Sequence, residues 1–142
     1  MKRLLSCALV IALSVLATGC GDLGTGPAAS LSGSYSLRSL DSSPVPASLY
    51  YYSATDHLEV ISSQLVLRAD GTYTDYTRVQ DTQGAYTRVY DDNTAGDWSL
   101  SGSQLALRDR IDYSHVSYGN VTNGRITIDN FAGYDVRAEY VR

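Results

Sequence analysis

Few residues in this sequence could carry catalytic or metal-binding chemistry, and only two of them are histidines. His57 and Glu59 are two positions apart on a predicted strand, so their side chains would lie on the same face. Asp56 is the neighbour of His57 in the sequence. Two ligands at this spacing could contribute to a metal site, but no third ligand is indicated. A polar strand end is the favoured interpretation. His115 follows Asp112 near a predicted loop, and we expect it to be exposed.

The acidic run 91–97 begins like a calcium-binding loop, because oxygen-bearing side chains alternate and Gly96 is sixth. However, Ala95 replaces a needed oxygen ligand, and Gly102 stands where the closing glutamate belongs. We therefore expect an Asp/Asn/Gly turn at residues 91–96 rather than a calcium site. The sequence predicts no metal site and no cofactor.

Signatures of catalysis are equally thin. The sequence has no Gly-x-Ser-x-Gly elbow of the serine hydrolases and no phosphate-cradling glycine loop. The two cysteines are Cys7 and Cys20, and neither falls in the region that we expect to fold. We predict a protein that is not an enzyme and has no catalytic residue.

Cys20 itself indicates a different chemistry, since it closes the run Leu16-Ala17-Thr18-Gly19-Cys20. A basic start at 1–3 precedes an apolar stretch at 4–17 that is too short to remain as a membrane span. This layout resembles a bacterial lipoprotein signal peptide with its lipobox. The resemblance implies cleavage before Cys20, diacylglycerol on its sulfur and, in many bacteria, acylation of the new amino terminus.

The same resemblance implies where the protein is found. A multiply acylated Cys20 would hold it to a lipid bilayer of the bacterial cell envelope without further contacts. Gly21, not Asp, follows Cys20, so the retention signal of some bacterial lipoproteins is absent. By that analogy the outer membrane is favoured over the inner membrane.

Charge restricts the partners. Without the predicted signal peptide the chain keeps 9 arginines against 15 acidic residues, a formal charge of −6. Such a surface repels phosphate, so we expect no nucleic-acid binding. With no cysteine left to pair, the folded part must be held by burial and hydrogen bonds alone.

The chain divides into a signal peptide (1–19), a lipidated cysteine with a Gly-rich flexible linker (20–30) and one folded domain (31–142). Within the domain, short alternating segments are separated by turn signals such as Asp70-Gly71 and Asn123-Gly124. No segment has a convincing helical period. The expected strands are 33–38, 49–53 (or a packed loop), 57–68, 72–80, 85–90, 97–100, 104–108, 115–121, 125–129 and 134–141.

This pattern predicts an all-β fold. About eight consecutive antiparallel strands leave two exposed edges unless the sheet closes, and closure gives an interior that is either filled or holds one small ligand. We therefore expect an antiparallel up-and-down β-barrel of about eight strands, with a two-sheet sandwich as the alternative.

Three segments also resemble a family of small lipocalin-like bacterial lipoproteins. These are Gly33-Ser34-Tyr35-Ser36-Leu37, the stretch 65–73 (LVLRADGTY) and the stretch 96–105 (GDWSLSGSQL), and the C-terminal 134–142 resembles a closing strand. The resemblance implies a calycin-type barrel that binds a small ligand or a partner.

Two functions remain open at this point. The 12 tyrosines suit a pocket for a small, partly apolar ligand inside the barrel. Alternatively, an exposed surface carrying Tyr50, Tyr51 and Tyr52 would dock an envelope protein. A barrel filled by side chains would argue against the first function, and burial of the three tyrosines would argue against the second.

Overall fold

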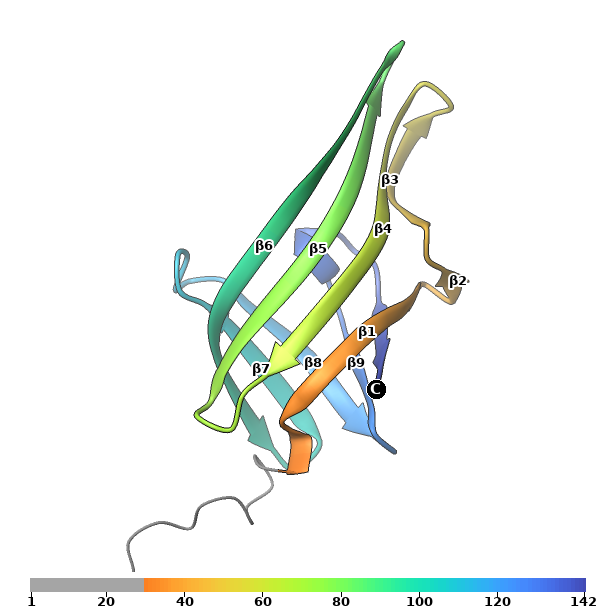
Figure 1. Cartoon of the computed structure of the whole chain (residues 1–142). Coiled ribbons are helices and arrows are strands. Elements are labelled where there is room, and N and C mark those ends of the chain that lie inside the picture. Colours follow the sequence, from red (N-terminus) through yellow and green to blue (C-terminus); the bar gives the residue numbers. More distant parts are fainter. Residues whose placement is uncertain (1–29) are drawn as a thin grey trace, which may run out of the picture.

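The computed structural model describes residues 30–142, which form one antiparallel sheet that closes into a barrel (Figure 1). The strands are β1 (Gly33–Leu40), β2 (Ser43–Pro44), β3 (Ala47–Ser53), β4 (Asp56–Leu67), β5 (Thr72–Gln83), β6 (Tyr86–Ser101), β7 (Gln104–Asp109), β8 (Val116–Thr122), β9 (Arg125–Ile128) and β10 (Ala138–Val141), with one 3-10 turn, η1 (Phe131–Gly133). The predicted signal peptide and Cys20 lie outside the described residues. No helix in the described part is long and apolar enough to cross a membrane.

Closure depends on β1, which has a neighbour on each side. Its first half pairs with β4 from Gly33 to Ser36, and its second half pairs with β10 from Ser36 to Leu40. The other strands follow in chain order, so eight strands complete an up-and-down ring. This confirms the predicted barrel over the sandwich. At its other end, from Asp56 to Val60, β4 pairs with β3 in place of β1.

The alternation of side chains explains the core. Successive residues of a strand face opposite sides, so the apolar member of each pair enters the barrel and its polar neighbour faces solvent. The buried set includes Tyr35, Leu37, Leu65, Leu67, Leu105, Leu107, Ile126, Ile128, Ala138 and Tyr140. Hairpins follow the expected turn chemistry, with positive φ at both Asn123 and Gly124.

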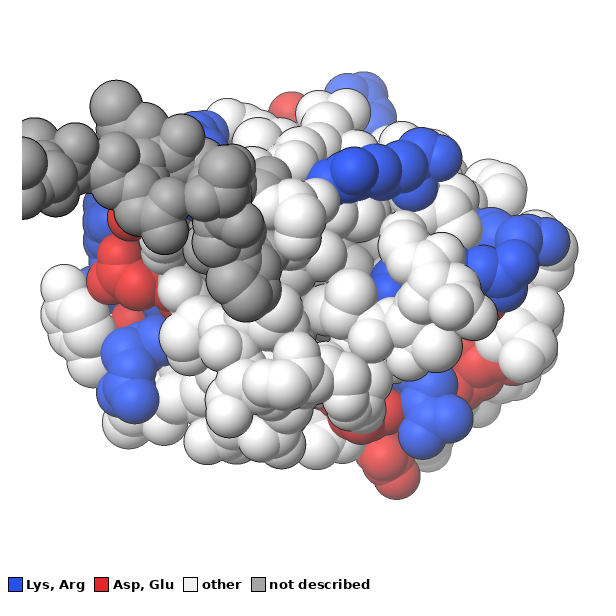
Figure 2. All heavy atoms as spheres, turned by 90° about the horizontal axis from the view of Figure 1, so that it is seen from below, with Lys and Arg blue, Asp and Glu red and all other residues white. Residues whose placement is uncertain are grey.

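The lower end of the barrel, where β1 begins, is sealed by aromatic side chains. The Trp98 indole N–H donates to the Arg68 carbonyl at 2.9 Å, and the Tyr35 hydroxyl donates to the Leu31 carbonyl at 2.7 Å. The Arg142 guanidinium lies 5.1 Å from the centre of the Tyr35 ring, a cation–π contact. Figure 2 shows this end as mainly uncharged, with arginines and acids around its rim.

The upper end is uneven because four strands outrun the others. β5 and β6 pair along their whole length up to Gln83 and Tyr86, whereas β7 meets β6 only from Gly96 onward. The upper parts of β3, β4, β5 and β6 therefore project as a single wall above the ring (Figure 1). Gly96 is the first residue of β6 that pairs with β7, and from there on β6 is part of the ring.

Two strand predictions were wrong. The expected loop at 91–96 belongs to β6, because each of its residues pairs with β5 and tertiary pairing overrides turn propensity. The last strand was expected from Tyr134 but begins at Ala138, since η1 and the residues after it fold back on themselves. The two-residue strand β2 was not predicted.

We predict that Gly96→Ala destabilises the barrel by about 1–3 kcal/mol, the usual range for an overpacked core. A Cβ at this position would overlap the Arg108 carbonyl oxygen and lie 2.7 Å from a ring carbon of Tyr73. Denaturant unfolding measures the change. Ser99→Ala, on the exposed side of the same strand, should stay within about 0.5 kcal/mol. Equal stability of Gly96→Ala and the native chain would contradict the close approach.

Candidate ligand-binding cleft

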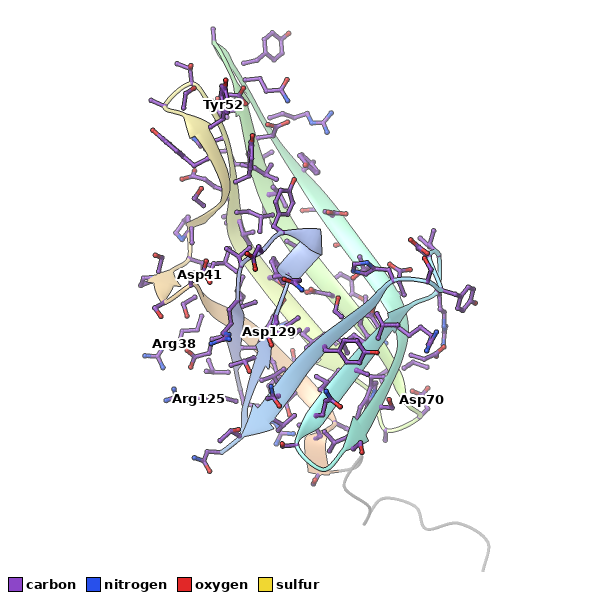
Figure 3. The ribbon with its side chains drawn as sticks, turned by 180° about the vertical axis from the view of Figure 1, so that it is seen from behind. Arg38, Asp41, Tyr52, Asp70, Arg125 and Asp129 are labelled. Carbon is purple, nitrogen blue, oxygen red and sulfur yellow. The ribbon has the colours of Figure 1, made fainter. Side chains whose placement is uncertain are left out.

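A cleft of about 280 Å³ lies where the wall rises above the ring. The inner face of the wall forms one side, and η1 with the residues after it forms the other. In Figure 3 the η1 turn lies across the wall strands, below the end that carries Tyr52 and well above the end that carries Asp70. The lining residues are Leu49, Leu58, Tyr73, Asp75, Thr77, Val79, Tyr90, Asp92, Thr94, Leu107, Asp109, His115, Ser117, Ile128, Phe131, Ala132 and Tyr134.

Phe131 supplies much of the apolar surface and separates the cleft from the core below. It is only 4% exposed, and its ring centre lies 6.3 Å from that of Tyr140. The turn that carries it is compact, because the Phe131 N–H donates to the Val136 carbonyl at 3.0 Å. Positive φ angles at Asn130 and Ala132 bend the chain around the ring.

A carboxyl group, Asp75, lies at the polar side of the cleft in a triangle of oxygen atoms. The Ser63 hydroxyl donates to one carboxyl oxygen at 2.5 Å, and the Tyr140 hydroxyl donates to the other at 3.0 Å. The two hydroxyl oxygens are also 2.8 Å apart.

The ionisation of these groups follows from their enclosure. Burial raises the pKa of Asp75 above its ordinary value of 3.8, and hydrogen bonds from Ser63 and Tyr140 offset part of that rise. Burial, and next the nearby Asp75, raise the pKa of Tyr140 well above 10. Enclosure therefore disfavours the charged forms of both groups.

Tyr73 is one of the hydroxyl-bearing residues that line the cleft. Burial raises its pKa to about 12, and the Asp109 carboxylate adds to the rise, while a hydrogen bond with Thr94 lowers it. The phenol therefore stays neutral and available for hydrogen bonding at physiological pH. Toward the rim, the His115 ring nitrogen Nε2 lies 3.4 Å from the Ser117 hydroxyl.

The two residues that were weighed as metal ligands, His57 and Glu59, have separate surroundings. Glu59 accepts a hydrogen bond from Gln80 at 3.4 Å, and the His57 ring lies 6.2 Å from that of Tyr51, away from the cleft. Within residues 30–142, no three His, Cys, Asp or Glu side chains gather in a way that could hold a metal ion.

The acidic run of β6 is a strand rather than the expected turn, and this separates its carboxylates. Asp92 lines the cleft, whereas its neighbour Asp91 lies 3.5 Å from the Arg78 guanidinium on the other face. Oxygen ligands on opposite faces of a sheet cannot bind one calcium ion. His115 is exposed, as predicted, but it also lies at the rim of the cleft.

Sequence reasoning missed Asp75 and Phe131. Asp75 had a signal, because it alternates with Tyr73, Thr77 and Val79 on the face that the pattern places inward. An acid in such a series points to a buried polar network. Phe131 had no such sequence signal. Its position over the core depends on the positive φ angles of Asn130 and Ala132, which the sequence pattern does not predict.

Comparison with known proteins adds no further constraint. No family model, no curated protein and no solved structure matches this chain.

We predict that the stability of Asp75→Asn relative to the native chain increases as the pH rises from below 4 toward neutrality. The folded chain holds the Asp75 proton more tightly than the unfolded chain, whose carboxyl titrates near 3.8. Above that pH the unfolded state loses its proton first, so the native free energy of unfolding falls until the raised pKa is passed. Asparagine cannot titrate. Thermal unfolding measured across this range tests the sign, and a difference independent of pH would contradict it.

Proposed function

We propose that this protein binds a small, partly apolar ligand in the cleft, as a lipid-anchored, lipocalin-like protein of the bacterial cell envelope that is not an enzyme. The cleft itself is the observation that supports ligand binding. The lower half of the ring is filled by side chains, but above it the wall and η1 leave space. Its volume of about 280 Å³ is close to the lower end of about 300–1,000 Å³ for ligand pockets.

The lining indicates what kind of ligand would fit. Aliphatic and aromatic side chains such as Leu58, Val79 and Phe131 offer an apolar surface. Asp75 and the Tyr73 hydroxyl offer hydrogen-bonding groups, and the lining includes no lysine or arginine. A ligand with an apolar body and a hydrogen-bond-donating end, such as a hydroxyl or an amine, matches both parts.

A non-catalytic role agrees with the same geometry. The Ser63 hydroxyl, which hydrogen-bonds Asp75, is buried and also contacts the Tyr140 hydroxyl. A nucleophile needs access to its substrate, and the buried hydroxyl of Ser63 lacks that access.

Attachment through acylated Cys20 would leave the cleft uncovered. The described chain begins at Ser30, at the sealed end of the barrel and opposite the cleft (Figure 1). At about 3.3–3.6 Å per residue, the segment from Cys20 to Ser30 reaches roughly 35 Å. The proposed partner at this end is the lipid bilayer, with the outer membrane favoured over the inner membrane.

The tyrosine-rich surface supports a second candidate, docking of an envelope protein. Tyr50, Tyr51 and Tyr52 of β3 are 48%, 64% and 74% exposed. Figure 3 shows Tyr52 near the top of the wall. Exposed clustered aromatic residues are typical of protein interfaces. Ligand binding is preferred because the cleft is concave and enclosed, whereas this surface is an open strand.

We predict that Ser117→Trp weakens binding of a neutral apolar probe, N-phenyl-1-naphthylamine, by at least about tenfold, or 1.4 kcal/mol. Ser117 is half-buried and lines the cleft, so an indole there would fill it. Probe fluorescence titrated with the full chain in detergent measures the affinity. The adjacent Tyr118→Trp, whose side chain faces solvent, is the matched control and should bind as the native chain does. Equal loss in both variants, or no probe binding by the native chain, would contradict the proposal.

We predict that radioactive palmitate is incorporated into the native chain and into Cys7→Ser, but not into Cys20→Ser. Only Cys20 stands at the end of the lipobox-like run, whereas Cys7 lies within the apolar stretch. Metabolic labelling in a bacterial host, followed by gel separation, provides the measurement. Label retained in Cys20→Ser would overturn the anchor.

A further inference from the structure

The outer edge of β6 is unpaired over half of the strand. Residues 86–95 pair with β5 on one side, and within residues 30–142 no strand pairs with their other side (Figure 1). Two hydrogen bonds fix which backbone groups point where. The Arg110 N–H donates to the Ala95 carbonyl on the outer side at 3.0 Å, and the Trp98 N–H donates to the Gly71 carbonyl on the β5 side at 2.7 Å.

These two hydrogen bonds identify the residues of β6 whose backbone groups are unpaired. Each residue of an antiparallel strand directs its N–H and C=O toward the same edge, and its neighbours direct theirs toward the other. The odd-numbered residues therefore present free backbone donors and acceptors outward. They are Thr87, Val89, Asp91 and Asn93.

This edge lacks the lysine, proline and bulges that often prevent strand pairing, although it carries three charged residues, Arg88, Asp91 and Asp92. It contains no proline, lysine or glycine, its pairing with β5 shows no register shift, and Tyr86 and Val89 are 81% and 41% exposed. The wall's other edge, β3, is different. Its pairing with β4 shifts register twice, and the chain enters it through Pro46. Bulges and prolines blunt an edge, so β6 is the open one.

We propose that a second copy of this chain pairs antiparallel with the outer edge of β6, about a two-fold axis at Tyr90. In this register the residues with free backbone groups lie opposite one another. Thr87 lies opposite Asn93 of the second copy, and Val89 lies opposite its Asp91. They form the hydrogen-bonded pairs of an antiparallel ladder. The two walls then join into one continuous sheet.

Charge selects this register. Arg88 falls opposite Asp92 of the second copy, twice by symmetry, at non-hydrogen-bonded positions where side chains lie closest. Neither residue has an ion-pair partner within residues 30–142, and the Arg88 guanidinium lies 4.5 Å from the centre of the Tyr90 ring. At the axis the two Tyr90 rings meet, and aromatic cross-strand pairs are favourable.

Neighbouring registers are worse. An axis at Arg88, Asp91 or Asp92 would place two like charges directly opposite each other, which destabilises a sheet. An axis at Val89 leaves Arg88 opposite Tyr90 and gives Asp92 no basic partner. In a register shifted by one residue, the free backbone groups of one copy would lie opposite residues of the other copy whose backbone groups already bond to β5. The ladder of hydrogen bonds then cannot form.

The dimer has consequences for attachment and for the cleft. Because the paired strands are antiparallel, the two sealed ends lie at opposite ends of the dimer. Tyr90 and Asp92 line the cleft, so the second copy's Arg88 would lie at its rim. The pairing is independent of the proposed ligand binding, since it rests on the edge alone.

Sedimentation velocity of the full chain in detergent, over a concentration series, tests the dimer. We expect the native chain to be dimeric and Arg88→Asp to raise the dimer dissociation constant by at least about tenfold. The double variant Arg88→Asp/Asp92→Arg should restore it, because the pair is reversed but kept. Arg38→Asp, the same charge change at an exposed position of β1 away from this edge, should remain dimeric. Circular dichroism confirms that each variant is folded.

A native chain that stays monomeric, an Arg88→Asp variant as dimeric as the native chain, or a double variant that stays monomeric would each overturn the proposal. Probe binding measured on the same samples separates this result from that of the proposed function, because a monomer that binds the probe refutes only the dimer.

Discussion

The hydrogen bonding of β1 to two neighbours is the constraint on which the rest of the structure depends. Ser36 is the point of exchange, paired with Gln64 of β4 and with Val141 of β10. Through this exchange the ring closes without a free edge in its lower half, and the apolar faces of all eight strands are buried. A chain without disulfides in its folded part needs such a closed core, because burial must offset nearly all of the conformational entropy.

The same closure explains why the upper half differs. β1 and β10 end where the ring ends, so β3 to β6 rise above it, and η1 lies across the cleft from their inner side. This single asymmetry produces the cleft, the half-enclosed Asp75 and the unpaired edge of β6. A buried carboxyl is tolerated here because Ser63 and Tyr140 supply donors and the open cleft supplies space.

Sequence patterns predicted the barrel because alternation and turn chemistry are local signals. Asp70-Gly71 and Asn123-Gly124 marked hairpins that the structure contains, and the inward positions of the lower strands were evident. The run Asp91–Gly96 looked like a loop because Asp, Asn and Gly are turn formers, and only its pairing with β5 makes it a strand. The cleft was beyond local reasoning, since it arises from unequal strand lengths around a ring and from the turn at Phe131.

Hydrogen exchange on the native protein tests the central claim most directly. If β1 closes the ring, its amides that bond to β4 and β10 open only on global unfolding, so they should exchange with the same free energy as the core amides around Leu105 and Ile126. Exchange of the β1 amides at a much lower free energy, while the other strands stay protected, would show an open sheet and contradict the account.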